Sequence, residues 1–416
     1  MDGGAARLAA GFLAFILGAC SFDFGSQPGD GSSPTTLFSA LNLDNVPTYY
    51  ETDANNSLEL AESVSVSEGP QAISGSISVG DVDVYDLGPV EPGDRIIVNV
   101  TAGAALDGAV ALFDDAGAAL LVSDHRNVYL GRYGPFIDVI IRRPSPSCFL
   151  ALSSTPGYDS AGDYVLTAMD EYPKPIPAPR EDVILLDFEG GTNVRIGTRS
   201  AIAVPAFDAA EISYDYYGAS DEMVAQIVAH VREDFAAYDV AILSTSEGAE
   251  YNAAMSRVYF GTYDEALLGV AEAVDEYNAT SGQEAIVFTN TFAAFMPLEP
   301  SVSEMAQAVA NVASHEIGHL LGLFHTDNHV DLMDVTASLN ELLLDQEFAM
   351  SPIYAAVFPL GSQDSVQSLL DAVGGDEALA RQKSVGRDRT RLKMSDRTLP
   401  PARTSSLFSS CGLHKH

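Results

Sequence analysis

The chain has 416 residues, enough for two or three domains of ordinary size, and 47% of them are hydrophobic, so a large core can form. A formal net charge of −37 argues against nucleic acid as a partner, because phosphate binding needs a basic surface. The three cysteines, Cys20, Cys148 and Cys411, are widely separated and lack metal-type spacing, which argues against a disulfide framework.

The first twenty residues have the pattern of an export signal. Arg7 precedes an apolar run at 9–19 that is too short to span a bilayer as a stable helix. The run ends in LGAC, which resembles the processing box of bacterial lipoproteins and implies cleavage before Cys20, acylation of its thiol and a lipid anchor in the membrane. An ordinary signal peptide with a chance cysteine is the alternative. Residues 21–56, rich in Gly, Ser and Pro at their start, are predicted to be a flexible tether.

Residues 57–170 have the pattern of an antiparallel β-sandwich. Polar and apolar residues alternate from Asp81 to Leu87, as in a strand. Further candidate strands, separated by turn signals, lie at 95–100, 109–114, 136–142, 148–154 and 163–169. The DVDVYDLG strand, the PGD turn, the LFDDAG hairpin and the final GDYVL resemble the pre-peptidase C-terminal domain of secreted bacterial proteases. This resemblance implies a small accessory sandwich rather than a catalytic one.

The segment 171–181 has proline at every second position from Pro173 to Pro179, which favours extended polyproline geometry and predicts a semi-rigid spacer between domains. The pattern then changes to mixed α/β. Candidate strands lie at 182–190, 240–246, 256–264 and 284–292, and candidate helices at 220–239 and 301–323. This order predicts a sheet with helices packed against it. The expected fold class is therefore α+β, with a sandwich followed by a mixed sheet.

The helix at 301–323 contains the candidate active site. His315 and His319 are four positions apart and therefore share one helix face. Neutral imidazole suits Zn²⁺, and a catalytic zinc takes three protein ligands and keeps a fourth position open. Glu316 can act as general base on a water at that position. Gly322 allows the turn that ends the helix, so that the chain can return and offer His325 as third ligand.

This HExxHxxGxxH sequence resembles the metzincin clan of zinc proteases, over about residues 182–375. The resemblance implies a long active-site helix and a methionine-containing turn beneath the metal, for which Met333 is the candidate. Thr326, directly after the third histidine, is closest in character to the serine of matrixins. Val335 stands where astacin-like and serralysin-like members have tyrosine, so a tyrosine ligand is not expected.

The motif and the resemblance predict a zinc-dependent endopeptidase that acts on extracellular or envelope proteins, with Glu316 as general base. By analogy with the clan, the strand at 284–292 is expected to form the upper edge of the cleft and to bind the substrate backbone. One alternative is a catalytically silent, surface-anchored binding protein with a protease-like fold. Another is a zinc hydrolase of other substrates. Bound Ca²⁺ stays open as well, although no strict calcium-loop repeat supports it.

The C-terminal residues 376–416 are predicted to be a disordered basic tail. From residue 381 onward, nine Lys and Arg face two acidic residues, with little apolar periodicity. A tail that binds a partner is the alternative. Because Cys148 lies in a predicted strand and Cys411 in this tail, the two are not expected to pair.

Overall fold

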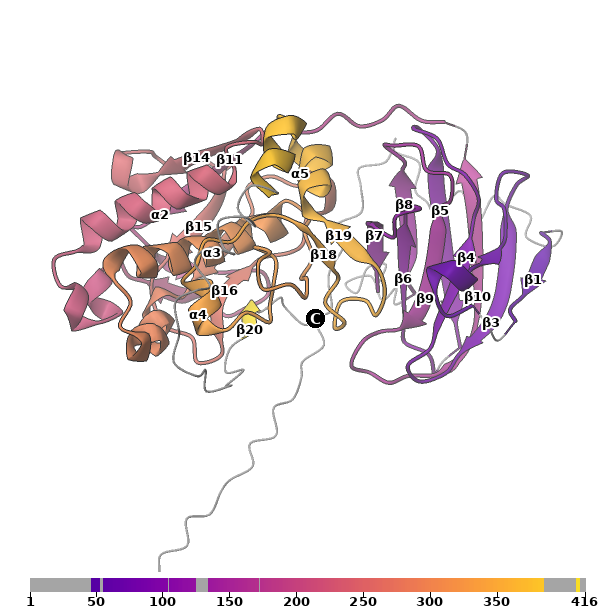
Figure 1. Cartoon of the computed structure of the whole chain (residues 1–416), viewed down its shortest axis with the longest axis horizontal. Coiled ribbons are helices and arrows are strands. Elements are labelled where there is room, and N and C mark those ends of the chain that lie inside the picture. Colours follow the sequence, from indigo (N-terminus) through magenta and orange to yellow (C-terminus); the bar gives the residue numbers. More distant parts are fainter. Residues whose placement is uncertain are drawn as a thin grey trace, which may run out of the picture.

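The computed structural model describes residues 46–52, 55–103, 105–124, 134–171 and 173–384, and the backbone of 409–411. Within these residues a β-sandwich and a mixed α/β domain lie side by side (Figure 1). The predicted α+β fold class is thereby confirmed. The export signal and Cys20 lie outside the described residues. None of the helices in the described part is both long and apolar enough to cross a membrane.

The sandwich consists of two five-stranded sheets that enclose one core. In spatial order, the first sheet contains β1 (Thr48–Tyr50), β3 (Gln71–Ile77), β10 (Gly162–Glu171), β5 (Arg95–Ala102) and β8 (Phe136–Ile140). The second contains β2 (Glu62–Ser63), β4 (Val82–Asp86), β9 (Phe149–Ser154), β6 (Gly108–Phe113) and β7 (Ala119–Ser123). Neighbouring strands are antiparallel except for the short pairs β1–β3 and β2–β4. The predicted strands are all present as parts of β4, β5, β6, β8, β9 and β10.

The sandwich begins earlier than predicted. The prediction of a flexible tether up to residue 56 is wrong for the described residues before it, because β1 pairs in parallel with β3. Asn55 is fully buried, and its carbonyl accepts a hydrogen bond from the backbone N–H of Val84 at 2.9 Å. Backbone groups that pair with a sheet are held by it, whatever the composition of the segment before them.

The alternation in β4 predicts the strand correctly but not the environment of its two faces. Asp83 and Tyr85 face the interior of the sandwich, where the Tyr164 hydroxyl donates to the Asp83 carboxylate at 2.7 Å. Burial raises the pKa of Asp83 to about 7. Val82 and Val84 face outward into a second cluster that includes residues of the α/β domain. Both faces of β4 are therefore covered.

The α/β domain contains a six-stranded sheet covered on one face by two helices. Its strand order is β14 (Val240–Ser244), β11 (Asp182–Asp187), β15 (Ser256–Phe260), β17 (Glu284–Val287), β16 (Leu267–Ala271) and β20 (Ser409–Cys411). The first four strands are parallel, β16 is antiparallel to β17, and β20 is parallel to β16. The helices α2 (Ser220–Asp234) and α3 (Val302–Leu320) share one hydrophobic core with this sheet.

Local sequence explains both ends of α3. At its start, Ser301 accepts a hydrogen bond from the N–H of Glu304, and the Glu304 carboxylate accepts one from the N–H of Ser301. This capping box satisfies helix donors that would otherwise lack partners. After Leu320 the chain reverses at Gly322, whose φ of +97° lies in the left-handed region that favours glycine. The helix therefore stops where the motif requires a turn.

Shorter elements complete the fold. These are β12 (Gly191–Val194), β13 (Ile202–Val204), β18 (Met350–Pro352), β19 (Ser362–Asp364), α4 (Leu339–Leu342) and α5 (Ser365–Val373). Single 3₁₀ segments are η2 (Leu58–Leu60), η4 (Ala209–Glu211), η5 (Tyr214–Tyr216), η6 (Thr245–Glu247), η7 (Glu276–Asn278) and η8 (Thr289–Leu298).

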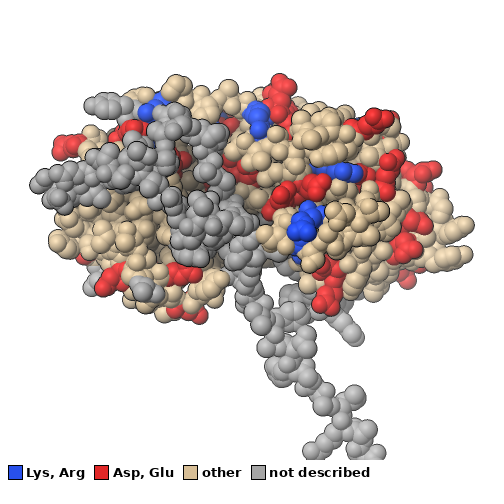
Figure 2. Space-filling model, turned by 180° about the vertical axis from the view of Figure 1, so that it is seen from behind, with Lys and Arg blue, Asp and Glu red and all other residues tan. Residues whose placement is uncertain are grey.

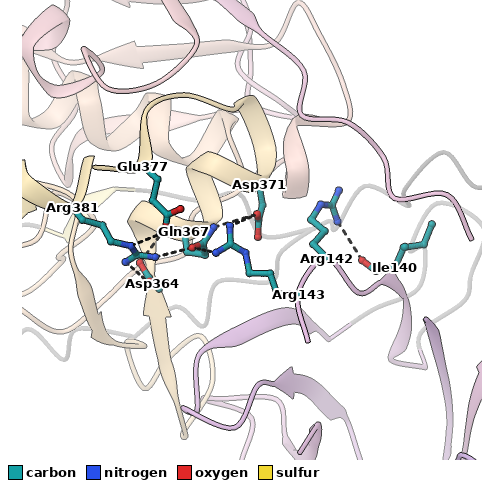
Figure 3. Close-up of polar contacts among 8 residues, drawn as sticks. All are labelled: Ile140, Arg142, Arg143, Asp364, Gln367, Asp371, Glu377 and Arg381. Atoms are coloured by element: carbon teal, nitrogen blue, oxygen red, sulfur yellow. Dashed lines mark hydrogen bonds and ion pairs between the residues drawn. The ribbon is translucent and has the colours of Figure 1, made fainter. Parts of the chain in front are cut away.

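The α/β domain extends further toward the C-terminus than predicted. Residues 377–384 are helical, and Ala380 is buried in the core shared with α2 and α3. The guanidinium of Arg381 donates to Gln367 at 2.7 Å and to Asp364 at 3.2 Å (Figure 3). The predicted tail is therefore wrong for residues 376–384, because a buried apolar side chain and these polar contacts hold them to the domain.

The two domains are packed together rather than separated by the Pro-rich segment. The outer face of the second sandwich sheet shares a buried cluster with Val274, Phe324, Ile353 and Phe358 of the α/β domain. Beside this cluster, Arg143 of the sandwich forms an ion pair with Asp371 on α5 at 3.0 Å (Figure 3). On the face shown in Figure 2, acidic side chains are spread over both domains with few Lys or Arg among them.

Candidate metal centre

Three histidine side chains converge at the C-terminal end of α3. The Nε2 atom of His319 lies 3.0 Å from that of His315 and 3.1 Å from that of His325. All three rings are buried. Tetrahedral zinc with Zn–N bonds of about 2.0–2.1 Å holds its ligand nitrogens roughly 3.3 Å apart. The three nitrogens therefore have the spacing that one metal ion requires, and imidazole nitrogens are suitable donors for zinc.

Backbone carbonyls set the orientation of the two helix histidines. Nδ1 of His315 lies 2.7 Å from the Leu332 carbonyl oxygen, and Nδ1 of His319 lies 2.7 Å from that of Leu323. A carbonyl oxygen can only accept, so each Nδ1 carries the proton and each Nε2 keeps its lone pair for a metal.

Burial also keeps these rings neutral. It lowers the pKa of His315 to about 4 and the pKa values of His319 and His325 well below the ordinary value. Neutral imidazole is the form that binds metal, so the site is ready for a cation at neutral pH. Among the described residues, these histidines form the one group of at least three His, Cys, Asp or Glu side chains close enough to hold a metal ion.

Glu316 is fully buried next to the first histidine, and its carboxylate lies against β16. A side chain at Gly269 of β16 would collide with that carboxylate. Neither β16 nor Gly269 was predicted from the sequence. The available signal was a glycine within the apolar stretch Leu-Leu-Gly-Val-Ala, since glycine inside a strand often marks close approach of another group.

The expectation that residues 284–292 form the edge of the cleft is wrong. Their strand, β17, lies inside the sheet and pairs with β15 on one side and β16 on the other. Its backbone groups are therefore already used. The strand beside Glu316 is β16, and its outer side pairs with β20, with Gly269 opposite Cys411.

Met333 is fully buried against α3, at the helix turn between His315 and His319. Gly318 provides the space for the Met333 side chain, because a side chain at position 318 would collide with the Met333 sulfur. Two contacts fix this loop. The N–H of Thr326 donates to the Met333 carbonyl at 2.9 Å, and Asp331 accepts from the Thr326 hydroxyl at 3.0 Å. The structure thus places the loop containing Met333 directly beneath the histidines.

The bend that returns His325 is packed against another turn of the domain. The N–H of Asp275 donates to the His319 carbonyl at 2.9 Å. A Cβ added to Gly322 would lie only 2.8 Å from the Cα of Glu276, so no larger residue fits. The glycine of the motif is thus required both for its φ and for this close approach.

Two further side chains of types that can bind metal, His329 and Cys148, lie outside the group of three histidines. His329 has an exposed side chain 3.9 Å from Glu341. Cys148 is a free thiol buried in the sandwich core, where burial raises its pKa. Neither belongs to the metal-binding group.

The matrixin family model matches residues 219–349, which include the complete histidine motif. A search of curated proteins found no match.

Three crystal structures are similar in part. An archaemetzincin from Methanopyrus kandleri is 16% identical, with 44% of this chain and 92% of that chain covered and a TM-score of 0.23. The pre-peptidase C-terminal domain of a Bacillus anthracis collagenase is 15% identical, with 27% and 94% covered and a TM-score of 0.21. A periplasmic inhibitor of g-type lysozyme from Aeromonas hydrophila is 12% identical, with 30% and 97% covered and a TM-score of 0.20.

With TM-scores this low, the matrixin match and the histidine geometry decide the interpretation. The match covers both α2 and α3 and the bend after α3. The same residues bring three neutral imidazoles together in a geometry that fits zinc. The chain therefore contains a metzincin-like zinc metallopeptidase domain.

Proposed function

We propose that this chain is a zinc-dependent endopeptidase that hydrolyses peptide bonds of extracellular or envelope proteins. The observation that carries the proposal is the convergence of His315, His319 and His325, with the buried Glu316 directly after the first of them in α3. A merely structural zinc site needs four protein ligands, whereas three leave a position for the reacting groups.

Bound in this site, zinc would act as a Lewis acid that lowers the pKa of a water molecule and polarises a substrate carbonyl. The three imidazoles would hold the metal, and the two carbonyls bonded to Nδ1 of His315 and His319 keep the rings aligned. A carboxylate oxygen of Glu316 accepts the proton of the attacking water and then passes it to the nitrogen of the leaving amine. Gly269 leaves the space in which this carboxylate lies.

The substrate backbone is proposed to bind along β16. An extended peptide can extend a sheet by pairing with its outermost strand. The strand that passes Glu316 is β16, which becomes outermost when β20 is absent. In the full chain β20 pairs with that side of β16, with Leu267 opposite Ser409. Activity should therefore be measured both on the full chain and on a chain that ends at Ser384.

The test is a digest of an unfolded protein and a peptide library, with zinc-loaded wild type, chelator-treated wild type and Glu316→Gln. Zinc-loaded wild type should cleave, and Glu316→Gln should bind zinc equally well but cleave about 10²–10⁴-fold more slowly. If wild type binds zinc and cuts neither substrate, the catalytically silent binding protein is the better interpretation. Cleavage that persists equally in Glu316→Gln would contradict its role as base.

The cellular location is part of the same proposal. We infer from the LGAC sequence that the chain is exported and anchored through a lipid on Cys20. Expression of wild type and Cys20→Ser in a bacterial host with labelled palmitate tests this. Wild type should take up the label and sediment with membranes, and the variant should do neither. Equal labelling of both proteins would exclude acylation at this residue.

A further inference from the structure

The turn formed by residues 275–278 lies between the metal centre and the sandwich. On one side it touches the end of the metal-binding helix. The N–H of Asp275 bonds to the carbonyl of the ligand His319, and the backbone of Glu276 and Tyr277 packs against Gly322. Any shift of this turn would therefore move the end of α3 and the bend that leads to His325.

This turn has a backbone conformation that its own sequence does not favour. Tyr277 and Asn278 have φ values of +58° and +51°, in the left-handed region that residues other than glycine rarely adopt. Such conformations persist only where surrounding contacts enforce them. The contacts around the turn therefore show what holds it.

Three of these contacts come from the sandwich. The Tyr277 hydroxyl donates to the carbonyl of Leu120 on β7 at 2.8 Å. The buried carboxyl group of Glu276 lies near the backbone N–H of Val122, on the same strand, which favours its charged form. The guanidinium carbon of Arg142 lies 3.8 Å from the centre of the Tyr277 ring, a cation–π distance. The Tyr277 ring also packs against the sandwich core.

The other side of the bend is also tied to the sandwich. Phe324, next to the ligand His325, is buried in the cluster between the domains together with Phe113 of β6. Its N–H donates to the Gln363 side chain at 2.7 Å, and its carbonyl accepts from the same side chain at 3.0 Å. Gln363 lies on β19, whose Ser362 bonds to the carbonyl of Gly117 beside β7 at 2.9 Å.

We propose that the sandwich is a positioning domain for the metal centre, which it holds by fixing the Gly322–His325 bend from both sides through Tyr277 and Phe324. The metal site is the one on which the proposed function rests, but the inference concerns the site's geometry and needs no peptidase activity. A domain that only tethers or generally stabilises the chain would lower the unfolding temperature when weakened. A positioning domain also changes how the site binds metal.

Two neighbouring residues of β6 allow a matched test, because their side chains point to opposite faces of one strand. Phe113 lies in the cluster between the domains, and Leu112 lies in the core of the sandwich itself. Phe113→Ala and Leu112→Ala both remove buried apolar volume from the same domain. The measurements are zinc affinity by chelator competition and the visible spectrum of the Co²⁺-substituted full chain, both below the unfolding transition.

Phe113→Ala should weaken zinc binding about 10-fold or more and alter the Co²⁺ spectrum, as expected when an outer support of a metal site is lost. Leu112→Ala should stay within about twofold of wild type in zinc affinity, with an unchanged spectrum. Equal zinc affinities and equal spectra in both variants would overturn the proposal. These readouts use no substrate, so a failure of the peptidase assignment would leave them unaffected.

A milder pair keeps the proposal testable if Phe113→Ala does not fold. Tyr277→Phe removes only the hydroxyl that bonds to Leu120. Tyr216→Phe removes a comparable bond, to the Pro300 carbonyl at 2.7 Å, near the far end of α3. Tyr277→Phe should weaken zinc binding several-fold and change the Co²⁺ spectrum, and Tyr216→Phe should change neither. Wild-type values for both variants would refute the proposed positioning.

Discussion

The sandwich and the α/β domain both bury ionisable groups, but they use them differently. In the sandwich, Asp83 is buried beside Tyr85 and Tyr164, and its pKa is raised to about 7. In the α/β domain, His315 is buried with its two partner histidines, and its pKa is lowered to about 4. The Asp83 carboxylate has the Tyr164 hydroxyl as a donor, whereas the three Nε2 atoms converge on one point. A shifted pKa indicates a ligand-binding site only where several ionisable side chains also face one position that a ligand can fill.

The largest effect that tests this contrast is expected from a metal ligand. His319→Ala should lower zinc affinity by more than the roughly 100-fold that loss of an outer-shell partner costs, and should abolish peptide hydrolysis, because its Nε2 lies within about 3 Å of both other ligands. The matched control is His329→Ala, since that side chain is 60% exposed and outside the group. Zinc content and cleavage rate are the measurements. Retention of tight zinc binding by His319→Ala would contradict the assignment of the three histidines as metal ligands.

The next largest effect concerns Gly269. Gly269→Ala should reduce the cleavage rate about 100-fold, because the added methyl group displaces the Glu316 carboxylate and small misplacements of a catalytic group cost about that much. Zinc affinity should remain near the wild-type value, because none of the three histidines is touched. Steady-state kinetics and chelator competition check both statements. A wild-type cleavage rate in Gly269→Ala would show that the Glu316 carboxylate does not need the space beside Gly269.

A smaller effect is expected from the strand that pairs with β16. A chain that ends at Ser384 should cleave protein substrates a few-fold faster than the full chain, since removal of β20 exposes backbone groups of β16 for pairing with substrate. Replacing Ser410 by proline in the full chain is a milder version of the same change. Zinc affinity should be equal in all three proteins. A slower truncated enzyme would contradict β16 as the substrate strand.

The subtlest prediction is the opposite response of the two regions to pH. The folded-state pKa of Asp83 is raised, so the stability it contributes is present below about pH 4 and is lost as the pH rises toward 7. The folded-state pKa of His315 is lowered, so its contribution in the metal-free chain is present above about pH 6.5 and is lost as the pH falls toward 4.

Calorimetry of wild type and Asp83→Asn separates the first of these contributions. The melting temperature of Asp83→Asn relative to wild type should be higher at pH 8 than at pH 5, because asparagine avoids burying a charge. Each unit of pKa shift is worth about 1.4 kcal/mol, so the difference is measurable. A difference that does not change with pH would mean that Asp83 titrates normally in the fold.

The amino-acid sequence by itself determines those features that depend on neighbours along the chain. The pairing of His315 with His319 follows from the helical repeat, the start of α3 from the Ser301 capping box, and its end from Gly322. The strands of the sandwich follow from short-range alternation and turn residues in the same way. Each of these patterns fits within a few residues, so it can be recognised without knowledge of the fold.

Only the tertiary structure decides which distant segments meet. It places Gly269 against Glu316, turns the valines of β4 toward the other domain, and inserts β16 where no strand was predicted. It also brings Leu120 of the sandwich to Tyr277, which is 157 residues away in the chain. Such contacts depend on how whole sheets pack, and packing responds to the shape and volume of both surfaces at once. A local sequence pattern describes only one of the two surfaces that pack together.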